Sequence, residues 1–127
     1  MNAAVRQHER QQANMAIPKL ERDRVERAVA KFCDRVPESI QSKLAYEYRI
    51  RGNEVVLLER RPSFDNKTQF TTLSFAKCVY SPRVGGWSLK CSDRNGRWHA
   101  YEGFDNVANL RDLFREVEAD PTGIFFG

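Results

Sequence analysis

Hydrophobic and polar residues follow two different periods along this chain. From residue 18 to about 35 the apolar positions recur mostly every three and four residues, which predicts an amphipathic helix with one buried face. Pro18 suits the first turn of such a helix, and Pro37 ends it because proline disfavours helical geometry in the residue before it. From residue 44 the period changes to two, which predicts strands.

The first two predicted strands, residues 44–51 and 55–61, are joined by Gly52-Asn53, which is typical of a two-residue hairpin turn. The register that follows has three pairs: Arg51 with Glu54, Ile50 with Val55, and Tyr48 with Leu57. A third strand is predicted over about 70–80. Its inward face stays unassigned, because apolar residues occupy both of its faces.

Residues 87–101 predict a second hairpin, in which D-R-N-G joins a fourth and a fifth strand. A loop of two or four residues puts odd positions before it on the same face as even positions after it. The inward set is then Trp87, Leu89, Cys91, Trp98 and Ala100, and the outward set is Ser88, Lys90, Ser92, Arg97, His99 and Tyr101. A three-residue loop with a bulge would exchange the two faces for the residues after the loop. We disfavour it because it places Trp98 beside polar neighbours.

A second helix is predicted near the end of the chain, capped by Asp105 or Asn106. Its apolar stripe is Val107, Leu110, Leu113, Phe114 and Val117. After Asp120-Pro121 the tail carries Ile124, Phe125 and Phe126, which must pack back onto the domain or into a partner.

These elements predict an α+β fold, a five-stranded antiparallel meander with the N-terminal and C-terminal helices packed on one face. We expect a flexible or frayed arm over residues 1–17 and a single domain over 18–127. The longest apolar run, Val55–Leu58, is far shorter than the roughly 20 residues of a membrane-spanning helix. The first residues lack the apolar core of a signal peptide, so we expect a cytoplasmic protein.

The net charge of +4 is unevenly distributed. Residues 1–43 hold nine basic and six acidic residues, 44–103 ten and six, and 104–127 two and five, which gives +3, +4 and −3. A positive middle can attract polyanions, although many proteins with so small a net charge bind none.

Cysteine and histidine chemistry is restricted by spacing. Cys33, Cys78 and Cys91 are an odd number without a C-x-x-C pair, which argues against a disulfide framework. These cysteines with His8 and His99 offer no closely spaced zinc ligands, and no cofactor fingerprint is present, so we expect neither metal nor cofactor. The even loop places Cys91 and His99 on opposite faces, which excludes a nucleophilic pair.

His99 is the one candidate for acid–base chemistry, with Asp93 or Glu102 as its orienting partner. A small enzyme or accessory subunit centred on His99 and Asp93, with Arg97 beside them, is therefore an alternative function. The simpler interpretation, which we favour, is a partly exposed strand histidine beside a turn whose Asp93, Asn95 and Gly96 are structural.

The outward face supplies the leading hypothesis, a non-enzymatic binding module. Its polyanion-binding candidates are Arg49, Arg51, Arg60, Lys90, Arg97, His99 and Tyr101. Cations around an aromatic ring can hold single-stranded nucleic acid or an acidic protein, while the simpler interpretation is a solvated face with Glu47 and Glu54 as counter-charges. Candidates for self-association, and so for a homodimer, are Val56, Leu58, Phe125 and Phe126.

Several motifs together indicate a family. The pattern W-x-L, then D-R-N-G-R-W-H-x-Y, then D-P-T-G-I-F-F-G at the terminus, with E-R-R-P-x-F at 59–64, resembles a family of small bacterial proteins described as a domain of unknown function. The resemblance covers about residues 25–127 and implies a compact bacterial cytoplasmic protein. It implies no activity, substrate or catalytic residue.

Overall fold

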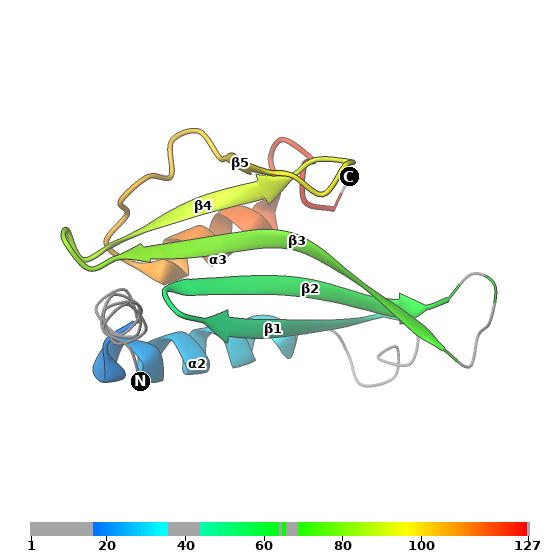
Figure 1. The fold of residues 1–127 in the computed structure, drawn as a ribbon, viewed down its shortest axis with the longest axis horizontal. Helices are drawn as coiled ribbons and strands as arrows, with labels where there is room; N and C mark the ends of the chain where they lie inside the picture. Colours follow the sequence, from blue (N-terminus) through cyan, green and yellow to red (C-terminus); the bar gives the residue numbers. More distant parts are fainter. Residues whose placement is uncertain (1–16, 36–43, 64, 66–68, 127) are drawn as a thin grey trace, which may run out of the picture.

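A five-stranded antiparallel sheet forms the middle of the molecule (Figure 1). The computed structural model describes residues 17–35, 44–63, 65 and 69–126. The elements are α2 (Lys19–Cys33), β1 (Ala45–Arg51), β2 (Glu54–Pro62), β3 (Phe70–Ser81), β4 (Gly86–Ser92), β5 (Trp98–Ala100) and α3 (Leu110–Ala119). The strands lie in the sheet in chain order, so the predicted α+β meander is confirmed.

Both helices cover the same face of the sheet, behind it in the view of Figure 1. The core lies between the helices and the sheet, and both helices and the strands contribute apolar residues to it. Among these residues are Val25, Val29, Phe32, Leu57, Cys78, Trp87, Leu89, Leu113 and Val117. No described helix covers the opposite side of the sheet, which we call the open face. None of the described helices is long and apolar enough to cross a membrane.

The hairpin of β1 and β2 has the predicted register, with Arg51 opposite Glu54 and Ile50 opposite Val55. Gly52 in the turn has φ of 58°, in the left-handed region that glycine enters without a steric penalty. Asn53 adds a second anchor, because its side-chain amide donates a 2.8 Å hydrogen bond to the carbonyl of Tyr80. The turn is thereby tied to the neighbouring strand.

A β-bulge explains why apolar residues occupy both faces of β3. Leu57 lies opposite Ala76 and Leu58 opposite Ser74, so Phe75 is an extra residue in the ladder. Phe75 and Ala76 are both buried although they are adjacent in sequence. After the bulge the even-numbered residues Ala76 and Cys78 face the helices, whereas before it the odd-numbered residues do. A strict alternation of faces along the strand does not predict this change.

The hairpin of β4 and β5 corrects the predicted face assignment. Ser92 pairs with Trp98, Cys91 with His99, and Lys90 with Ala100, so odd positions share a face across the turn. The loop has three residues and a bulge: Asp93 N donates to Arg97 O at 2.8 Å, and Gly96 N donates to Asp93 O at 3.0 Å. Gly96 has φ of 77°, the left-handed conformation this loop requires.

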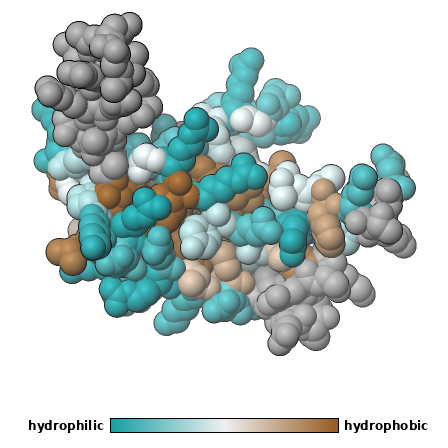
Figure 2. Space-filling view, turned by 60° about the horizontal axis from the view of Figure 1, so that its bottom comes forward, coloured by the Kyte–Doolittle hydropathy of each residue, from teal (hydrophilic) through white to brown (hydrophobic). Residues whose placement is uncertain are grey.

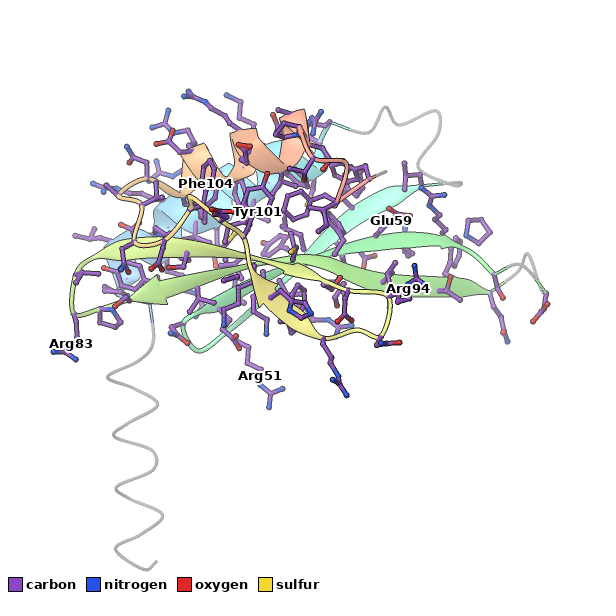
Figure 3. The ribbon with its side chains drawn as sticks, turned by 90° about the horizontal axis from the view of Figure 1, so that it is seen from above. Arg51, Glu59, Arg83, Arg94, Tyr101 and Phe104 are labelled. Atoms are coloured by element: carbon purple, nitrogen blue, oxygen red, sulfur yellow. The ribbon has the colours of Figure 1, made fainter. Side chains whose placement is uncertain are left out.

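This register exchanges two sets of side chains. Trp98 and Ala100, predicted to be inward, lie on the open face, while His99 and Tyr101, predicted to be outward, lie on the helix side. Figure 3 shows Tyr101 and Phe104 on the helix side of the sheet and Arg51 pointing away from the helices. The Tyr101 ring packs 5.3 Å from that of Phe125, and burial raises the pKa of its phenol above the ordinary value.

The last helix begins later than predicted. Val107 pairs with Trp87 through two backbone hydrogen bonds of 2.7 and 2.8 Å, so it continues the sheet instead of starting the helix. Asp105 and Asn106 are held by the Ser88 hydroxyl, which donates to the Asp105 carboxylate and accepts from Asn106 N. Neither residue caps α3, which starts at Leu110.

Of the two alternatives predicted for the C-terminal tail, packing onto the domain holds for Phe125, while Ile124 and Phe126 are 50% and 39% exposed. Phe125 is only 7% exposed and belongs to the core. The carboxylate of Asp120, at the left-handed end of α3, accepts hydrogen bonds from the backbone N–H groups of Phe125 and Phe126. At the other end Ile17 is buried in the core, whereas the predicted arm before it lies outside the described residues.

Candidate functional site

One row of side chains crosses the whole open face. Arg49, Val56, Lys77, Lys90 and Ala100 are successive partners on β1 to β5, and directly opposed residues point to the same face. We call these five residues the central row. It places three cations in line on a surface that no described helix covers.

Lys77 and Lys90 are direct cross-strand partners, an arrangement of like charges that destabilises a sheet. Lys77 is partly compensated, since its Nζ lies 3.2 Å from Glu54 Oε2 and 4.6 Å from the ring centroid of Trp98. Within the described part of the chain Lys90 forms no ion pair. The centre of the open face therefore carries Lys90 without an ion-pair partner in the described residues, opposite a lysine that contacts an indole ring.

A second cation–aromatic pair lies further along β2 and β3. The Arg60 guanidinium carbon is 4.9 Å from the ring centroid of Phe70, and Arg60 Nε is 3.4 Å from Glu47 Oε1. Phe70 is 48% exposed and sits on the open face, as its pairing with Pro62 shows. Figure 2, which views the open face obliquely, shows apolar patches interrupted by hydrophilic side chains.

The predicted polyanion-binding residues do not all share this face. Arg49, Arg51, Arg60 and Lys90 lie on it by their pairing register. His99 and Tyr101 lie on the helix side, and Arg97 closes the hairpin loop. Three further residues complete the surface and are missing from the sequence prediction: Lys77, Trp98 and Phe70. Their faces depend on the bulge in β3 and on the odd loop, which the alternation alone does not reveal.

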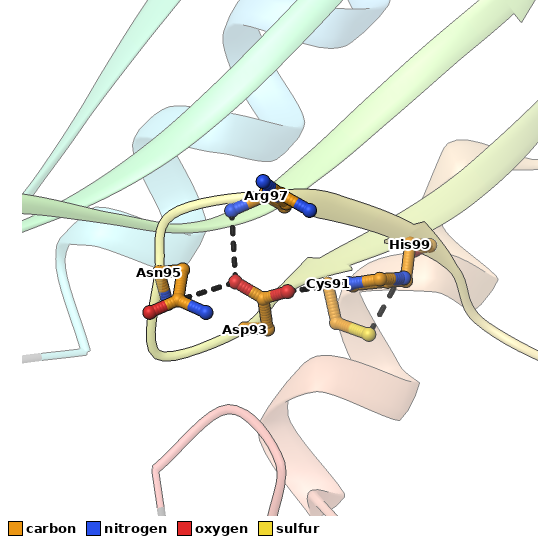
Figure 4. Close-up of polar contacts among 5 residues, drawn as sticks. All are labelled: Cys91, Asp93, Asn95, Arg97 and His99. Carbon is orange, nitrogen blue, oxygen red and sulfur yellow. Dashed lines mark hydrogen bonds and ion pairs between the residues drawn. The ribbon is translucent and has the colours of Figure 1, made fainter.

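His99 and Asp93 are brought together, with His99 Nε2 2.7 Å from Asp93 Oδ2 (Figure 4). The other carboxylate oxygen, Oδ1, accepts the backbone N–H groups of Asn95 and Arg97 at 2.8 and 2.9 Å. This is the turn role that the sequence suggests for Asp93. The His99 side chain, in the middle of β5, is 58% exposed, and neither partner lines the groove that the helices form.

The hydrogen bond from His99, followed by that from Arg97 N, lowers the pKa of Asp93 below its ordinary value. Replacing His99 by alanine is expected to raise that pKa towards the ordinary range, which side-chain carboxyl NMR during an acid titration measures. A depressed pKa means that the carboxylate's contribution to stability is present at neutral pH and is lost as the pH falls through the folded-state pKa. An unchanged Asp93 pKa in the variant would show that the loop amides alone hold it down.

Cys91 and His99 share a face, which corrects the prediction that they lie apart. The Cys91 thiol nevertheless lies 3.7 Å from the backbone carbonyl oxygen of His99, while the imidazole contacts Asp93. Burial, followed by the charges of Asp34 and Glu47, raises the pKa of Cys33 to about 11, and burial raises that of Cys78. Those two thiols stay protonated and unreactive at neutral pH.

The four self-association candidates differ in exposure. Leu58 is 3% exposed even though it points to the open face, so the apolar outer side of β2 is covered within the chain. Phe125 is buried in the core, Val56 is half-buried in the central row, and Phe126 is 39% exposed. Among the described residues, no three histidine, cysteine, aspartate or glutamate side chains gather as metal ligands would.

The fold and this surface define a class: a small α+β domain in which two helices cover one face of an antiparallel meander and the other face presents cations and aromatic rings. The chain belongs to the family Domain of unknown function (DUF3024), whose model matches residues 17–127. No curated protein and no solved structure matches it. The predicted membership of a family of unknown function is confirmed.

Proposed function

We propose that the domain is a non-enzymatic module that binds single-stranded nucleic acid on the open face. The observation that carries the proposal is the central row, in which Lys77 lies opposite Lys90 and also contacts the indole of Trp98. Such platforms combine cations that follow the phosphates with aromatic rings on which bases stack. Single strands suit this surface because their bases are free to stack.

Two features of the face favour this ligand over an acidic protein. Trp98 is half-buried and Phe70 is half-exposed, and each ring already attracts a cation, so the surface offers two stacking positions. The cations Arg49, Lys77 and Lys90 lie in one line across the strands, which suits a continuous chain of phosphates. Glu47 and Glu54 are held by Arg60 and Lys77 and leave Arg49 and Lys90 available.

The proposal is tested with a labelled oligothymidylate of about 16 nucleotides, near the upper end of known site sizes. We expect Lys90→Glu to weaken binding by about tenfold, since one favourable charge becomes a repulsive one. This variant keeps the fold, because a glutamate opposite Lys77 replaces a like-charge pair by an attractive one. Fluorescence anisotropy at several salt concentrations gives the affinity and its salt dependence.

The matched control is Arg111→Glu, which makes the same change of charge on α3, on the other side of the sheet. It should bind as the wild type does. Equal weakening by both variants would mean attraction by net charge alone, and an absence of binding at low salt would remove the proposal. The expected location in the cytoplasm stays a prediction.

A further inference from the structure

The two helices enclose a groove on the side of the molecule opposite the open face. It has a volume of about 780 Å³, and α2 and α3 form its walls. Figure 1 shows these helices side by side behind the sheet, running in roughly the same direction. The floor is apolar and closed, since Val25, Phe32 and Phe114 are buried beneath it and only Ala28 is partly exposed.

The rims of the groove are strongly basic. Six cations line it: Arg24, Arg27, Lys31, Arg35, Arg111 and Arg115. Only two acidic residues do so, Glu21 and Glu118, which leaves a net charge of +4. That equals the net charge of the entire chain.

The cations follow the periodicity of a helix. On α2, Arg24, Arg27 and Lys31 are spaced by three and four residues, and on α3 Arg111 and Arg115 are four residues apart. Residues at these spacings lie one above another on a helix face, about 5.4 Å apart per turn. Acidic side chains spaced four residues apart on a third helix would meet both rims at the same intervals.

The chain itself neutralises these cations only in part. Arg24 pairs with Glu21 at 3.7 Å, Arg35 with Glu118 at 3.6 Å and Arg115 with Asp112 at 3.6 Å. In the described part of the protein Lys31 and Arg111 form no ion pair. The segments outside the described residues have no acidic excess either: residues 1–16 hold two arginines and one glutamate, and 36–43 hold one glutamate and one lysine. The positive charge that these ion pairs leave on Lys31 and Arg111 suits a partner with carboxylates.

We propose that this groove docks an acidic amphipathic helix of a partner protein. Two neighbouring helices present a groove into which the side chains of a third can pack, and a partner helix fits with small apolar residues on the floor and carboxylates towards both rims. Leu20 adds an apolar contact, because it lies one turn before Arg24 on the same face of α2 and is 79% exposed.

A nucleic acid fits this groove less well. The aromatic rings beneath it, Phe32 and Phe114, are buried and pack on each other at 5.6 Å, so no ring is available for a base. A phosphate backbone would also lie over an apolar floor that gives it no hydrogen bonds. The proposal does not depend on nucleic-acid binding at the open face.

The two tryptophans report on the two surfaces separately. Trp87 Nε1 donates a 3.2 Å hydrogen bond to Glu21 Oε1, and Glu21 lines the groove. The indole of Trp98 lies on the open face beside Lys77. The two indole N–H signals in a ¹H–¹⁵N NMR spectrum of the full chain therefore distinguish ligands of the groove from ligands of the sheet.

The experiment titrates the full chain with a synthetic helical peptide that carries glutamates four residues apart on both sides of an alanine and leucine stripe. We expect the Trp87 indole signal and the amides of α2 and α3 to shift, and the Trp98 indole to stay unchanged. The double variant Lys31→Glu, Arg111→Glu is expected to bind at least tenfold more weakly, whereas Lys90→Glu binds as the wild type does. Circular dichroism confirms that the variants are folded.

Three results would overturn the proposal. The first is no shift of the groove signals at low salt, and the second is equal binding by a peptide with glutamine at every glutamate position. The third is a Trp87 shift with oligothymidylate and none with the peptide, which would assign the groove to nucleic acid. Loss of oligothymidylate binding at Trp98 alone would leave this proposal standing and remove only the function of the open face.

Discussion

Replacing Trp87 by alanine is expected to lower the free energy of unfolding by about 3–5 kcal/mol, the usual cost of removing a large buried aromatic side chain. Trp87 is fully buried, its ring packs 5.0 Å from that of Tyr80, and its indole N–H donates to Glu21. The substitution removes these contacts and leaves a cavity between α2 and the sheet. Denaturation with urea, followed by far-ultraviolet circular dichroism, measures the change.

The matched control is Trp98→Ala, which removes the same side chain from the open face. Trp98 is half-buried and its ring contacts the Lys77 ammonium, so a cost of about 1 kcal/mol is expected. If the two substitutions destabilised the protein equally, both indoles would belong to the core and the three-residue loop would be wrong. The comparison therefore tests the register of the second hairpin as well as its energetics.

Replacing Gly86 by alanine is the second substitution expected to have a large effect, about 2–3 kcal/mol, near the upper end of the range for overpacking. A Cβ at this position would lie 2.8 Å from the carbonyl carbon and oxygen of Asn106. Both are backbone atoms of the segment that places Val107 beside Trp87, so they cannot move without breaking that bridge. Thermal and urea denaturation of the variant give the magnitude.

Gly96→Asn serves as the control for this substitution. Gly96 has positive φ but nothing within 4 Å of an added Cβ, and asparagine tolerates the left-handed conformation better than most residues. The control should cost well under half as much as Gly86→Ala. A loss in Gly86→Ala no larger than that in Gly96→Asn would mean that the Asn106 backbone moves aside for the added methyl group at little cost.

The regular parts of the fold follow from the sequence because local chemistry and alternation agree there. Gly52-Asn53 permits one short turn, and that turn fixes the pairing of Ile50 with Val55. The apolar spacing of three and four defines the buried face of α2, and Pro18 precedes its first residue. At these places the turn residues and the hydrophobic alternation allow only one arrangement of the backbone.

The second hairpin could not be predicted because D-R-N-G fits loops of two, three or four residues. The Asp93 side chain favours the three-residue loop, since one carboxylate accepts Asn95 N, Arg97 N and the ring of His99. Alternation alone disfavours that loop, because it places Trp98 among polar neighbours. A lysine over an indole is an attractive contact, so this neighbour favours the open face.

The candidate site was also predicted only in part, because the face on which some of its residues lie depends on strand pairing and not on local sequence. Arg49, Arg51 and Arg60 follow the alternation of β1 and β2, and the sequence places them on one face. Lys77 needs the bulge at Phe75, which depends on packing between strands and has no local signal in the sequence. The groove between α2 and α3 depends on tertiary packing, and its two rims are 76 residues apart from Arg35 to Arg111.

The opposed lysines of the central row have a consequence for thermal resistance. Repulsion between Lys77 and Lys90 lies at the middle of the sheet, where β3 and β4 hold the meander together. An anion placed between the two ammonium groups would turn that repulsion into two attractions. The same contact that binds a ligand would then stabilise the pairing of the two strands, and the melting temperature would rise with ligand concentration as the ligand's affinity for the folded domain requires.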